Sequence, residues 1–413
     1  SLQDRILLLD GAMGSLIQTY GLVEKDFRGN LDLPEGTNVQ GNNDLLSLTR
    51  PDIISDIHRR YLEAGADIIT ANTFSSQRVS QAEYHCGHLV KQLNTESVRI
   101  AKGQAEAFST TEKPRYVIAT IGPTSKSLSI SPDVNDPAFR AITYDELYDA
   151  YREQACALLE AGVDGILVET VSDTLNAKAA MDAIETAMQE RDVRVPMMLS
   201  ITVNDRFGRI LSGQTLEALL ASVSHFPLLS IGLNCSFGAE DMLPSLRTLA
   251  AKAPYFISAH PNAGLPNAMG QYDQSPTMMA VQMEHFVSEG LVNIIGGCCG
   301  TTPEHIAALH PLTTKGTPHI PIAKEALGYS IQLSGLEPLT TKNDDTVFIN
   351  VGERCNVAGS RKFLRLIKEK TYEEALEIAR QQVLDGAMVL DLNMDDGMLD
   401  TRTEMCHFLH LIG

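Results

Sequence analysis

The sequence lacks several features that would assign it to a specialised class of protein. No apolar run approaches the roughly 18–20 residues of a membrane-spanning helix. Its first residues, SLQDRILLLDGAMG, lack the basic region, apolar stretch and cleavage site of a signal peptide. Basic residues number 33 against 52 acidic ones, and the net charge of −19 argues against binding to nucleic acid or anionic membranes. With 44% hydrophobic and 21% charged residues, the composition predicts a globular protein, and we expect it in the cytoplasm.

Cysteine is scarce, and its number is odd. Seven cysteines in 413 residues do not predict the disulfide framework of a small secreted protein. Three of them are candidates for a metal site: Cys235 in LNCS, and the pair Cys298 and Cys299 in GGCCGTT. Three thiolates can hold a zinc ion and leave its fourth position open, as catalysis requires. The alternatives are a buried apolar role for each cysteine and a redox role for the adjacent pair, in which a disulfide would be strained.

Eight short apolar runs predict strands of a parallel sheet. Their hydrophobicity is continuous rather than alternating, as in strands that are covered on both faces. Amphipathic helical patterns lie between them, for example at Asp52–Ala64 and Tyr144–Ala161. The predicted strands are Ile6–Leu9, Ala66–Ala71, Tyr116–Ile121, Gly165–Val168, Pro196–Val203, Leu228–Leu233, Tyr255–Ala259 and Leu291–Ile295.

A recurring segment marks the joints between helix and strand. It reads LEAGADII, LEAGVDGI, VSEGLVNI and VLDGAMVL, and each copy has a Gly where a helix should end in the left-handed conformation. Eight strand–helix units within about 300 residues predict an α/β fold, a (β/α)8 TIM barrel, rather than an open doubly wound sheet. The phosphate-binding fingerprints GxGxxG and GxxxxGK[ST] are both missing from the sequence.

The active site of such a barrel lies at the carboxyl ends of the strands. Cys235 follows the sixth predicted strand, and Cys298 and Cys299 follow the eighth, so one rim should gather all three. A metal at that rim would hold an incoming thiol as a thiolate, which is the nucleophile for alkyl transfer. The same rim should also carry Asp10-Gly11, Asn72, Gly122-Pro123, Glu169 and His260-Pro261-Asn262.

The two rim carboxylates suggest a substrate with an amino group. Asp10 and Glu169 could hold an ammonium group, and backbone N–H groups near Gly11–Gly14 could hold a carboxylate. Helix capping or loop structure is the alternative role for each carboxylate.

The pattern changes after residue 310. Residues 311–345 are rich in Pro, Thr and Gly and predict an interdomain linker. A second series follows, with a strand at Val347–Val351, a helical region at Lys362–Arg380 and a strand at Ala387–Leu392. Because two βα units cannot close a barrel, we expect residues 1–310 to form one barrel and residues 346–413 to be the truncated start of a second, incomplete TIM barrel.

Several motifs resemble those of a known enzyme family. LLLDGAMGSLIQ, ITANTF, IGPT, VETVSDTLNAKAA, LNCS, HPNAGLP and GGCCGTTPEHI together resemble the homocysteine S-methyltransferase domain. INVGERCNVAGSRKFLRLI and LDLNMDDGMLD resemble the opening of a pterin-binding methyltransferase barrel. This order of domains is similar to that of the cobalamin-dependent methionine synthases, of which the chain would be an N-terminal fragment. The resemblance covers nearly the whole chain.

The resemblance implies a methyltransferase that forms methionine from homocysteine. Cys235, Cys298 and Cys299 would bind zinc, and the homocysteine sulfur would be the fourth ligand. Its thiolate would attack the methyl group of methylcobalamin, which is carried by a cobalamin domain absent from this chain. 5-Methyltetrahydrofolate would be the ultimate methyl donor, and the fragment would be only partly active.

The resemblance also implies roles for further residues. Asp10, Gly11 and Glu169 would anchor the amino-acid end of homocysteine, with help from Asn234 and Thr73. Asn262 would occupy the open zinc position when no substrate is bound. In the second region, the folate-binding residues would be Asn356, Asp391 and Asn393. The alternative role for Asp391 and Asn393 is to cap the junction between a strand and the following loop.

Two other functions remain open from the sequence. A cobalamin-independent, single-barrel homocysteine methyltransferase would take its methyl group from betaine or S-methylmethionine, although the segment GERCNVAGSRKF argues against it. A non-catalytic zinc-binding barrel would instead have a closed coordination sphere.

Overall fold

A computed structural model of the protein describes residues 2–205, 207–267, 270, 272–323, 331–341 and 348–413. The chain divides into two compact units. One comprises Ser1–Lys126, Thr143–Tyr329 and Leu333–Leu339, and the other comprises Ser127–Ile142, Ser330–Gln332 and Thr340–Gly413.

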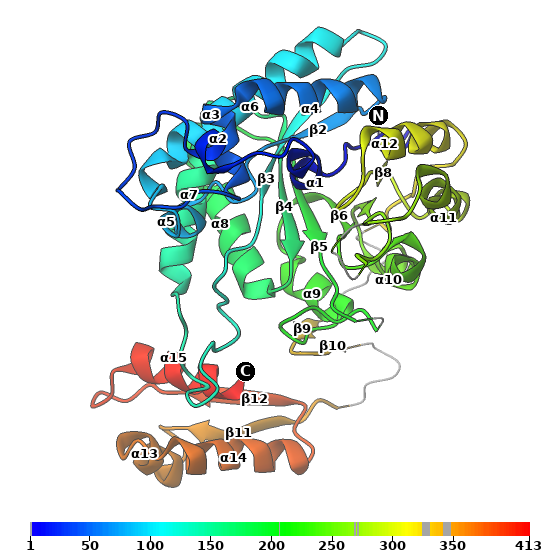
Figure 1. Cartoon of the computed structure of the whole chain (residues 1–413). Helices are drawn as coiled ribbons and strands as arrows, with labels where there is room; N and C mark the ends of the chain where they lie inside the picture. Colours follow the sequence, from blue (N-terminus) through cyan, green and yellow to red (C-terminus); the bar gives the residue numbers. More distant parts are fainter. Residues whose placement is uncertain (1, 206, 268–269, 271, 324–330, 342–347) are drawn as a thin grey trace. The chain divides into compact units, whose positions relative to one another are not determined.

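The first unit is built on a ring of eight parallel strands (Figure 1), in the order β1-β8-β7-β6-β5-β4-β3-β2. The two ends of this order meet at a parallel bridge between Leu9 and Ile68, where the Asp10 N–H donates to the Ile68 carbonyl at 3.0 Å. The unit is therefore a TIM-like barrel, and the predicted fold class is confirmed. The strands are β1 Leu7–Leu8, β2 Ile68–Ala71, β3 Tyr116–Ile121, β4 Gly165–Val171, β5 Met197–Ile201, β6 Leu228–Asn234, β7 Phe256–His260 and β8 Ile294–Ile295.

Helices surround the ring (Figure 1), and their ends follow sequence signals. In α7, the Thr143 hydroxyl accepts from the Glu146 N–H at 3.2 Å while the Glu146 carboxylate accepts from the Thr143 N–H at 2.8 Å, which is a capping box. The main helices are α4 Pro51–Glu63, α6 Val90–Phe108, α7 Tyr144–Glu160, α8 Thr174–Arg191, α9 Leu216–Val223, α10 Ala239–Lys252, α11 Pro276–Ser288 and α12 Pro303–Leu309. Shorter helices are α1 Met13–Gln18, α2 Glu24–Arg28, η1 Asn43–Leu45, α3 Leu46–Thr49, α5 Arg78–Ala82, η2 Gly87–Leu89 and η3 His310–Thr314.

Apolar side chains from six strands pack together inside the ring. The interior of such a barrel is a filled core and not a pore. A binding site is therefore expected at the ends of the strands and not inside the ring. The cluster consists of Leu7, Leu9, Ile68, Ile118, Leu167, Met198 and Ile294.

The predicted linker contains two short strands, β9 Gln332–Ser334 and β10 Pro338–Thr340. The turn between them is hydrogen bonded to the barrel residues that directly precede α9. The Thr215 N–H donates to the Leu336 carbonyl at 3.0 Å, and the Gln214 side chain donates to the Gly335 carbonyl at 2.8 Å. The boundaries predicted at residues 310 and 345 remain predictions.

The second unit contains β11 Val351–Asn356, α13 Arg361–Lys368, α14 Tyr372–Leu384, β12 Val389–Asn393 and α15 Thr401–Ile412. Strands β11 and β12 are parallel. The predicted strand at Val347–Val351 is wrong in its position: of its described residues only Val351, the first residue of β11, is in a strand, and Phe348 is 79% exposed. The predicted helix at Lys362–Arg380 is two helices, separated where Lys370 adopts a positive φ of 60°.

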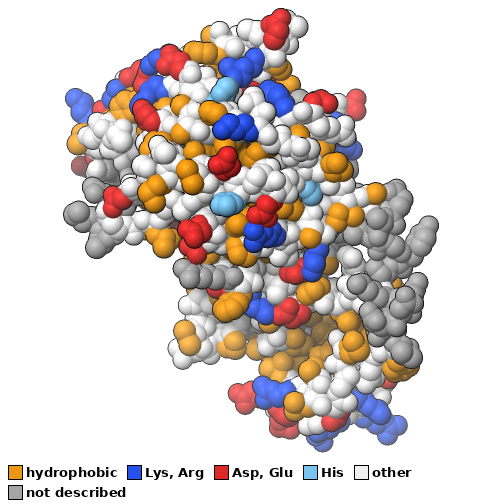
Figure 2. Space-filling view, turned by 90° about the vertical axis from the view of Figure 1, so that its right-hand side faces the viewer, with side chains coloured by type: hydrophobic (Ala, Val, Ile, Leu, Met, Phe, Trp, Pro, Cys, Tyr) orange, Lys and Arg blue, Asp and Glu red, His pale blue; other side chains and the backbone are white. Residues whose placement is uncertain are grey.

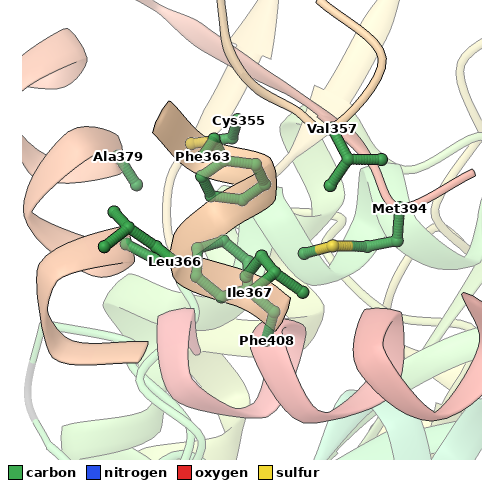
Figure 3. Packing of buried hydrophobic residues seen from close by; sticks show 9 residues of the cluster. Cys355, Val357, Phe363, Leu366, Ile367, Ala379, Met394 and Phe408 are labelled. Carbon is green, nitrogen blue, oxygen red and sulfur yellow. The ribbon is translucent and has the colours of Figure 1, made fainter. Parts of the chain in front are cut away.

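A small apolar core holds the second unit together (Figure 3). The rings of Phe363 in α13 and Phe408 in α15 meet edge to face at 5.3 Å, which is a favourable aromatic geometry. Around them lie Cys355, Val357, Leu366, Ile367, Ala375, Ala379 and Met394. The βα pattern predicted from the sequence thus forms a unit with its own apolar core. Helix α15 was not predicted.

Charges of both signs are interspersed over the face shown in Figure 2. Ion pairs join neighbouring helices of the first unit, such as Arg152 with Glu190 and Arg247 with Glu289. Within the described residues, no helix combines the length and the apolar character needed to cross a membrane.

Candidate metal and substrate site

A cavity of about 350 Å³ lies at the carboxyl ends of the barrel strands. The structure brings eight of the predicted site residues to its wall: Asp10, Gly11, Thr73, Glu169, Asn234, Cys235, Cys298 and Cys299. They come from segments far apart in the sequence, as the predicted barrel requires.

The three cysteines form a compact group. Their sulfur atoms lie within 4.8 Å of one another, and the Cys235 and Cys299 sulfurs are 3.5 Å apart. Ligands about 2.3 Å from a tetrahedral zinc would be spaced by about 3.8 Å. The donor set therefore fits a soft divalent metal bound by three thiolates.

The end of β7 supports both loops that carry the cysteines. β7 lies between β6 and β8 in the sheet. The Cys235 N–H donates to the His260 carbonyl at 3.1 Å, and the Cys298 N–H donates to the Pro261 carbonyl at 2.8 Å. The Cys299 carbonyl in turn accepts from the Ala263 N–H at 2.9 Å. These backbone bonds hold the sulfurs together from two distant segments.

The backbone around Cys235 is strained. Cys235 and Ser236 have φ values of 61° and 59°, and Thr170 at the neighbouring strand end has 58°. Residues with a Cβ adopt this left-handed region at a cost of about 1–3 kcal/mol each, and such strain clusters at functional sites. The two successive left-handed residues turn the chain sharply as it leaves β6.

Three thiols this close cannot all ionise without a cation, because their charges would repel one another. Hydrogen bonds from Cys235 and Cys298 lower the pKa of Cys299 to about 3. Hydrogen bonding with Cys235 and Cys299, together with burial, raises the pKa of Cys298 well above its ordinary value. A bound divalent metal would remove this conflict, because a coordinating thiol is deprotonated outright.

Asn234 lies against the cysteines, and its amide is fully engaged. Its Nδ2 donates to the Thr170 hydroxyl at 3.0 Å and lies 3.9 Å from the Cys298 sulfur. Its Oδ1 accepts from the Thr170 N–H at 3.1 Å and from the Ser200 hydroxyl at 2.6 Å. Asn234 is thus placed to support Cys298, while its role in substrate binding remains a prediction.

The two carboxyl groups of the cavity are held in an environment that disfavours their charge. Burial raises the pKa of Asp10 to about 8, although hydrogen bonds from Thr70 partly offset this and the charge of Glu169 adds to it. Burial likewise raises the pKa of Glu169 to about 7; hydrogen bonding with Thr120 partly offsets this rise, and the charge of Cys299 adds to it. A cationic group entering the cavity would favour the ionised form of both.

Gly11 allows two loops to approach closely. A Cβ atom at Gly11 would lie 2.6 Å from the Thr301 hydroxyl and 2.9 Å from the Tyr61 hydroxyl. The Thr301 hydroxyl accepts from the Ala12 N–H at 3.0 Å and donates to the Cys298 carbonyl at 2.7 Å. The DGAMG and GGCCGTT segments are thereby joined beside the cavity.

Other predicted site residues have different surroundings. The Thr73 hydroxyl donates to the Thr120 carbonyl at 2.8 Å and accepts from the Thr120 N–H at 3.1 Å, so it links β2 to β3. Asn262 is 4% exposed, and among the described residues its Oδ1 has no hydrogen-bond partner, but it is not part of the cavity wall. Its role as a metal ligand remains a prediction.

The three predicted pterin contacts lie in the second unit. Asn356 at the end of β11 pairs in register with Asn393 at the end of β12. Asp391 precedes Asn393 by two residues on the same strand and so shares its face. The structure brings the two asparagines together, although the strand predicted before Asn356 ended at Val351; the pterin-binding role of all three residues remains a prediction.

Sequence reasoning missed several residues of the site. Thr70 donates to the Asp10 carboxylate at 2.8 Å, Thr120 lies on the cavity wall with Glu169, and Tyr272 packs against Gly300, next to Cys299. His260, foreseen only as a rim residue, lines the cavity; burial lowers its pKa to about 4, and its Nε2 has no hydrogen-bond partner in the described part of the chain. The threonines could have been found from their positions at strand ends, whereas Tyr272 lies in a loop whose path no pattern indicates.

Comparison with known proteins adds two family matches. The homocysteine S-methyltransferase model matches residues 7–312, and the pterin binding enzyme model matches residues 352–413. Three crystal structures of the homocysteine methyltransferase MmuM from Escherichia coli are similar to this chain. The oxidized form is 21% identical, with a TM-score of 0.57, over 74% of this chain and 95% of that one.

The metallated form of MmuM is 22% identical, with a TM-score of 0.55, over 74% of this chain and 96% of that one. The apo form is 22% identical, with a TM-score of 0.52, over 74% of this chain and 95% of that one. At this level of identity, the likeness to all three shows a shared fold.

Proposed function

Because the chain belongs to the homocysteine S-methyltransferase family, we propose that it forms methionine by methylating the sulfur of homocysteine at a zinc ion held by Cys235, Cys298 and Cys299. The observation that carries this proposal is the grouping of three thiols, within 4.8 Å of one another, on the wall of a cavity that also contains two carboxyl groups.

The metal and the carboxyl groups have separate tasks in the proposal. A zinc ion on three thiolates would supply an open position at which a fourth thiol is kept as its thiolate near neutral pH. Asp10 and Glu169 would bind the α-ammonium group of homocysteine, which supplies the positive charge that both buried carboxylates lack. The cysteines must be reduced to bind the metal, which agrees with the cytoplasmic location expected from the sequence.

The chain's own residues would orient the substrate between these two groups. Thr70 fixes the Asp10 carboxylate through its N–H at 2.8 Å, and Thr120 lies with Glu169 on the cavity wall. An amino acid held at its ammonium end would present its side-chain sulfur toward the cysteines on the same cavity wall. This orientation brings the nucleophile to the open rim of the barrel, where a methyl donor can approach.

We propose methylcobalamin, carried by a domain outside this sequence, as the immediate methyl donor, and 5-methyltetrahydrofolate as the ultimate one. The support is the order of the two family matches, a homocysteine region followed by a pterin region. In the pterin region, Asn356, Asp391 and Asn393 would recognise the donor and acceptor edge of the pterin. The Asn356 Oδ1 accepts from the Ala358 and Gly359 N–H groups at 2.9 and 3.1 Å, and its Nδ2 donates to the Glu353 carboxylate at 3.3 Å, so a ligand would use the second N–H of this amide.

Methyl-donor specificity tests the proposal. Zinc-loaded protein is incubated with homocysteine and, in separate reactions, methylcobalamin, betaine or S-methylmethionine, and methionine is measured. We expect methionine from methylcobalamin alone. Methionine from betaine or S-methylmethionine, but not from methylcobalamin, would show a cobalamin-independent homocysteine methyltransferase instead.

Zinc X-ray absorption separates a catalytic centre from a structural one. With homocysteine present, the number of sulfur ligands should rise from three to four, as expected for an open site. Unchanged coordination, with no methionine from any donor, would identify a non-catalytic zinc-binding barrel.

A further inference from the structure

Tyr272, in the loop between β7 and α11, packs against Gly300, the residue that follows Cys299. A Cβ atom at Gly300 would lie 2.3 Å from both Cβ and Cγ of Tyr272. Only a glycine next to Cys299 therefore leaves room for the tyrosine side chain. Burial raises the pKa of Tyr272 to about 12, and the charge of Cys299 and hydrogen bonding with its thiol add to this, so the phenol hydroxyl faces the Cys299 sulfur.

The loop around Tyr272 is anchored on both sides. An antiparallel bridge joins Tyr272 to Pro266 within the loop. Before it, the Ala263 N–H donates to the Cys299 carbonyl at 2.9 Å. After it, the Gln274 carbonyl accepts from the His305 ring at 2.9 Å, which ties the loop to α12. These contacts hold the loop that carries Tyr272 next to the segment that carries Cys299.

The metal site needs hydrogen-bond donors of this kind. A zinc ion with three thiolates carries one net negative charge, and a fourth thiolate adds another. The surrounding protein is itself acidic, with a net charge of −19. The Asn234 amide already faces the sulfur of Cys298 at 3.9 Å. Tyr272 is the candidate donor for Cys299.

We propose that Tyr272 is a positioning residue of the metal site, whose hydroxyl donates a hydrogen bond to the Cys299 sulfur and so fixes this ligand and withdraws part of its charge. A thiolate that shares its charge with a donor leaves the metal more attractive to a further sulfur. Partners of metal ligands commonly contribute 10–100-fold in metal affinity. The inference rests on the proposed function, since it assumes that the three cysteines bind a metal.

The test uses the full chain, metal-free and reduced, in three forms: wild type, Tyr272→Phe and Tyr144→Phe. Phe keeps the ring against Gly300 and removes only the hydroxyl. Tyr144 is a matched control, because its hydroxyl bonds Asp182 on the outer helices. Zinc affinity is measured by competition with a chromophoric chelator, and the thiolate-to-metal charge-transfer band is recorded with Co²⁺ as the probe. Thermal melting of the metal-free proteins checks that each variant folds.

We expect Tyr272→Phe to bind zinc about 10–100-fold more weakly and to shift the Co²⁺ band to lower energy, because the unbonded thiolate is the better electron donor. Tyr144→Phe should match the wild type, and 4-aminophenylalanine at position 272, which keeps a donor, should restore most of the affinity. Wild-type affinity and an unshifted band in Tyr272→Phe would overturn the inference alone. Loss of an oxygen ligand from the metal in this variant would also overturn it, since Tyr272 would then be a direct ligand. Failure of the wild type to bind one metal per chain would overturn the proposed function and this inference together.

Discussion

Replacing Asp10 by Asn should stabilise the metal-free barrel by an amount that grows with pH. Burial raises the pKa of Asp10 from 3.8 to about 8 in the folded protein. Between these values, the folded protein keeps a proton that the unfolded chain has released. The stability of the wild type therefore falls as the pH rises through this window. An amide has no proton to release, so the variant escapes this loss.

The size of the effect follows from the width of the window. Each pH unit between the two pKa values lowers the free energy of unfolding by about 1.4 kcal/mol. From pH 5 to pH 7, the advantage of Asp10→Asn should thus grow by about 3 kcal/mol. The Asn side-chain oxygen can still accept from the Thr70 N–H, which bonds Asp10 at 2.8 Å. The change with pH is therefore the diagnostic quantity.

Urea unfolding of the reduced, metal-free proteins at pH 5, 6 and 7 measures this advantage, with far-ultraviolet circular dichroism as the signal. Asp32→Asn is the matched control, because Asp32 is exposed and its replacement should give no pH-dependent gain. The Asp10 variant should also bind norvaline, which has the amino-acid end of homocysteine without its thiol, about 10–100-fold more weakly, because the ammonium loses a charged partner. An advantage of equal size at all three pH values would refute the reasoning that folded Asp10 holds a proton.

Three further predictions concern the same barrel. Cys298→Ala should abolish zinc binding and homocysteine methylation without changing the circular dichroism spectrum, because the metal is added to a preformed rim. The control Cys156→Ser, on α7, should keep both zinc binding and methylation. A circular dichroism spectrum of an unfolded chain in Cys298→Ala would contradict this prediction. In calorimetry, norvaline should bind the wild type more tightly as the pH rises from 6 to 8, since carboxyl groups with pKa values of about 8 and about 7 must ionise to hold its ammonium; a constant affinity would exclude this role for Asp10 and Glu169. Arg5→Ala should lower the free energy of unfolding by about 1–3 kcal/mol in urea, because Asp67, only 2% exposed, loses its bidentate partner, while zinc affinity stays the same.

The barrel and its cysteine site could be predicted because both depend on the order of elements. Continuous apolar runs identified the strands, and a parallel barrel brings the carboxyl ends of its strands to one rim. Cys235 after β6 and Cys298 after β8 therefore had to meet, whatever the details of their loops. The cavity carboxylates Asp10 and Glu169 were predicted in the same way, because each lies at the end of a predicted strand.

The unforeseen features depend on contacts that no local pattern records. The amide of Asn234 is directed by Thr170 and Ser200 on neighbouring strands, so its place next to Cys235 did not reveal its bonds. Tyr272 reaches Cys299 through the path of a loop. In the second unit, the apolar residue Phe348 suggested a strand, yet it is 79% exposed, and β11 begins only at Val351. An apolar residue indicates a strand only where something covers it.

The position of β7 between the two cysteine loops has a mechanical consequence. In the proposed metal-bound state, Cys235 and Cys298 would be cross-linked, and the chain between them, which includes α10, β7 and α11, would become a closed ring. A cross-link around a segment of roughly sixty residues restricts the unfolded chain by an amount on the order of 4 kcal/mol. Ligands on one strand or one loop would enclose almost nothing. The atoms that activate the substrate would therefore also hold about a fifth of the barrel against unfolding.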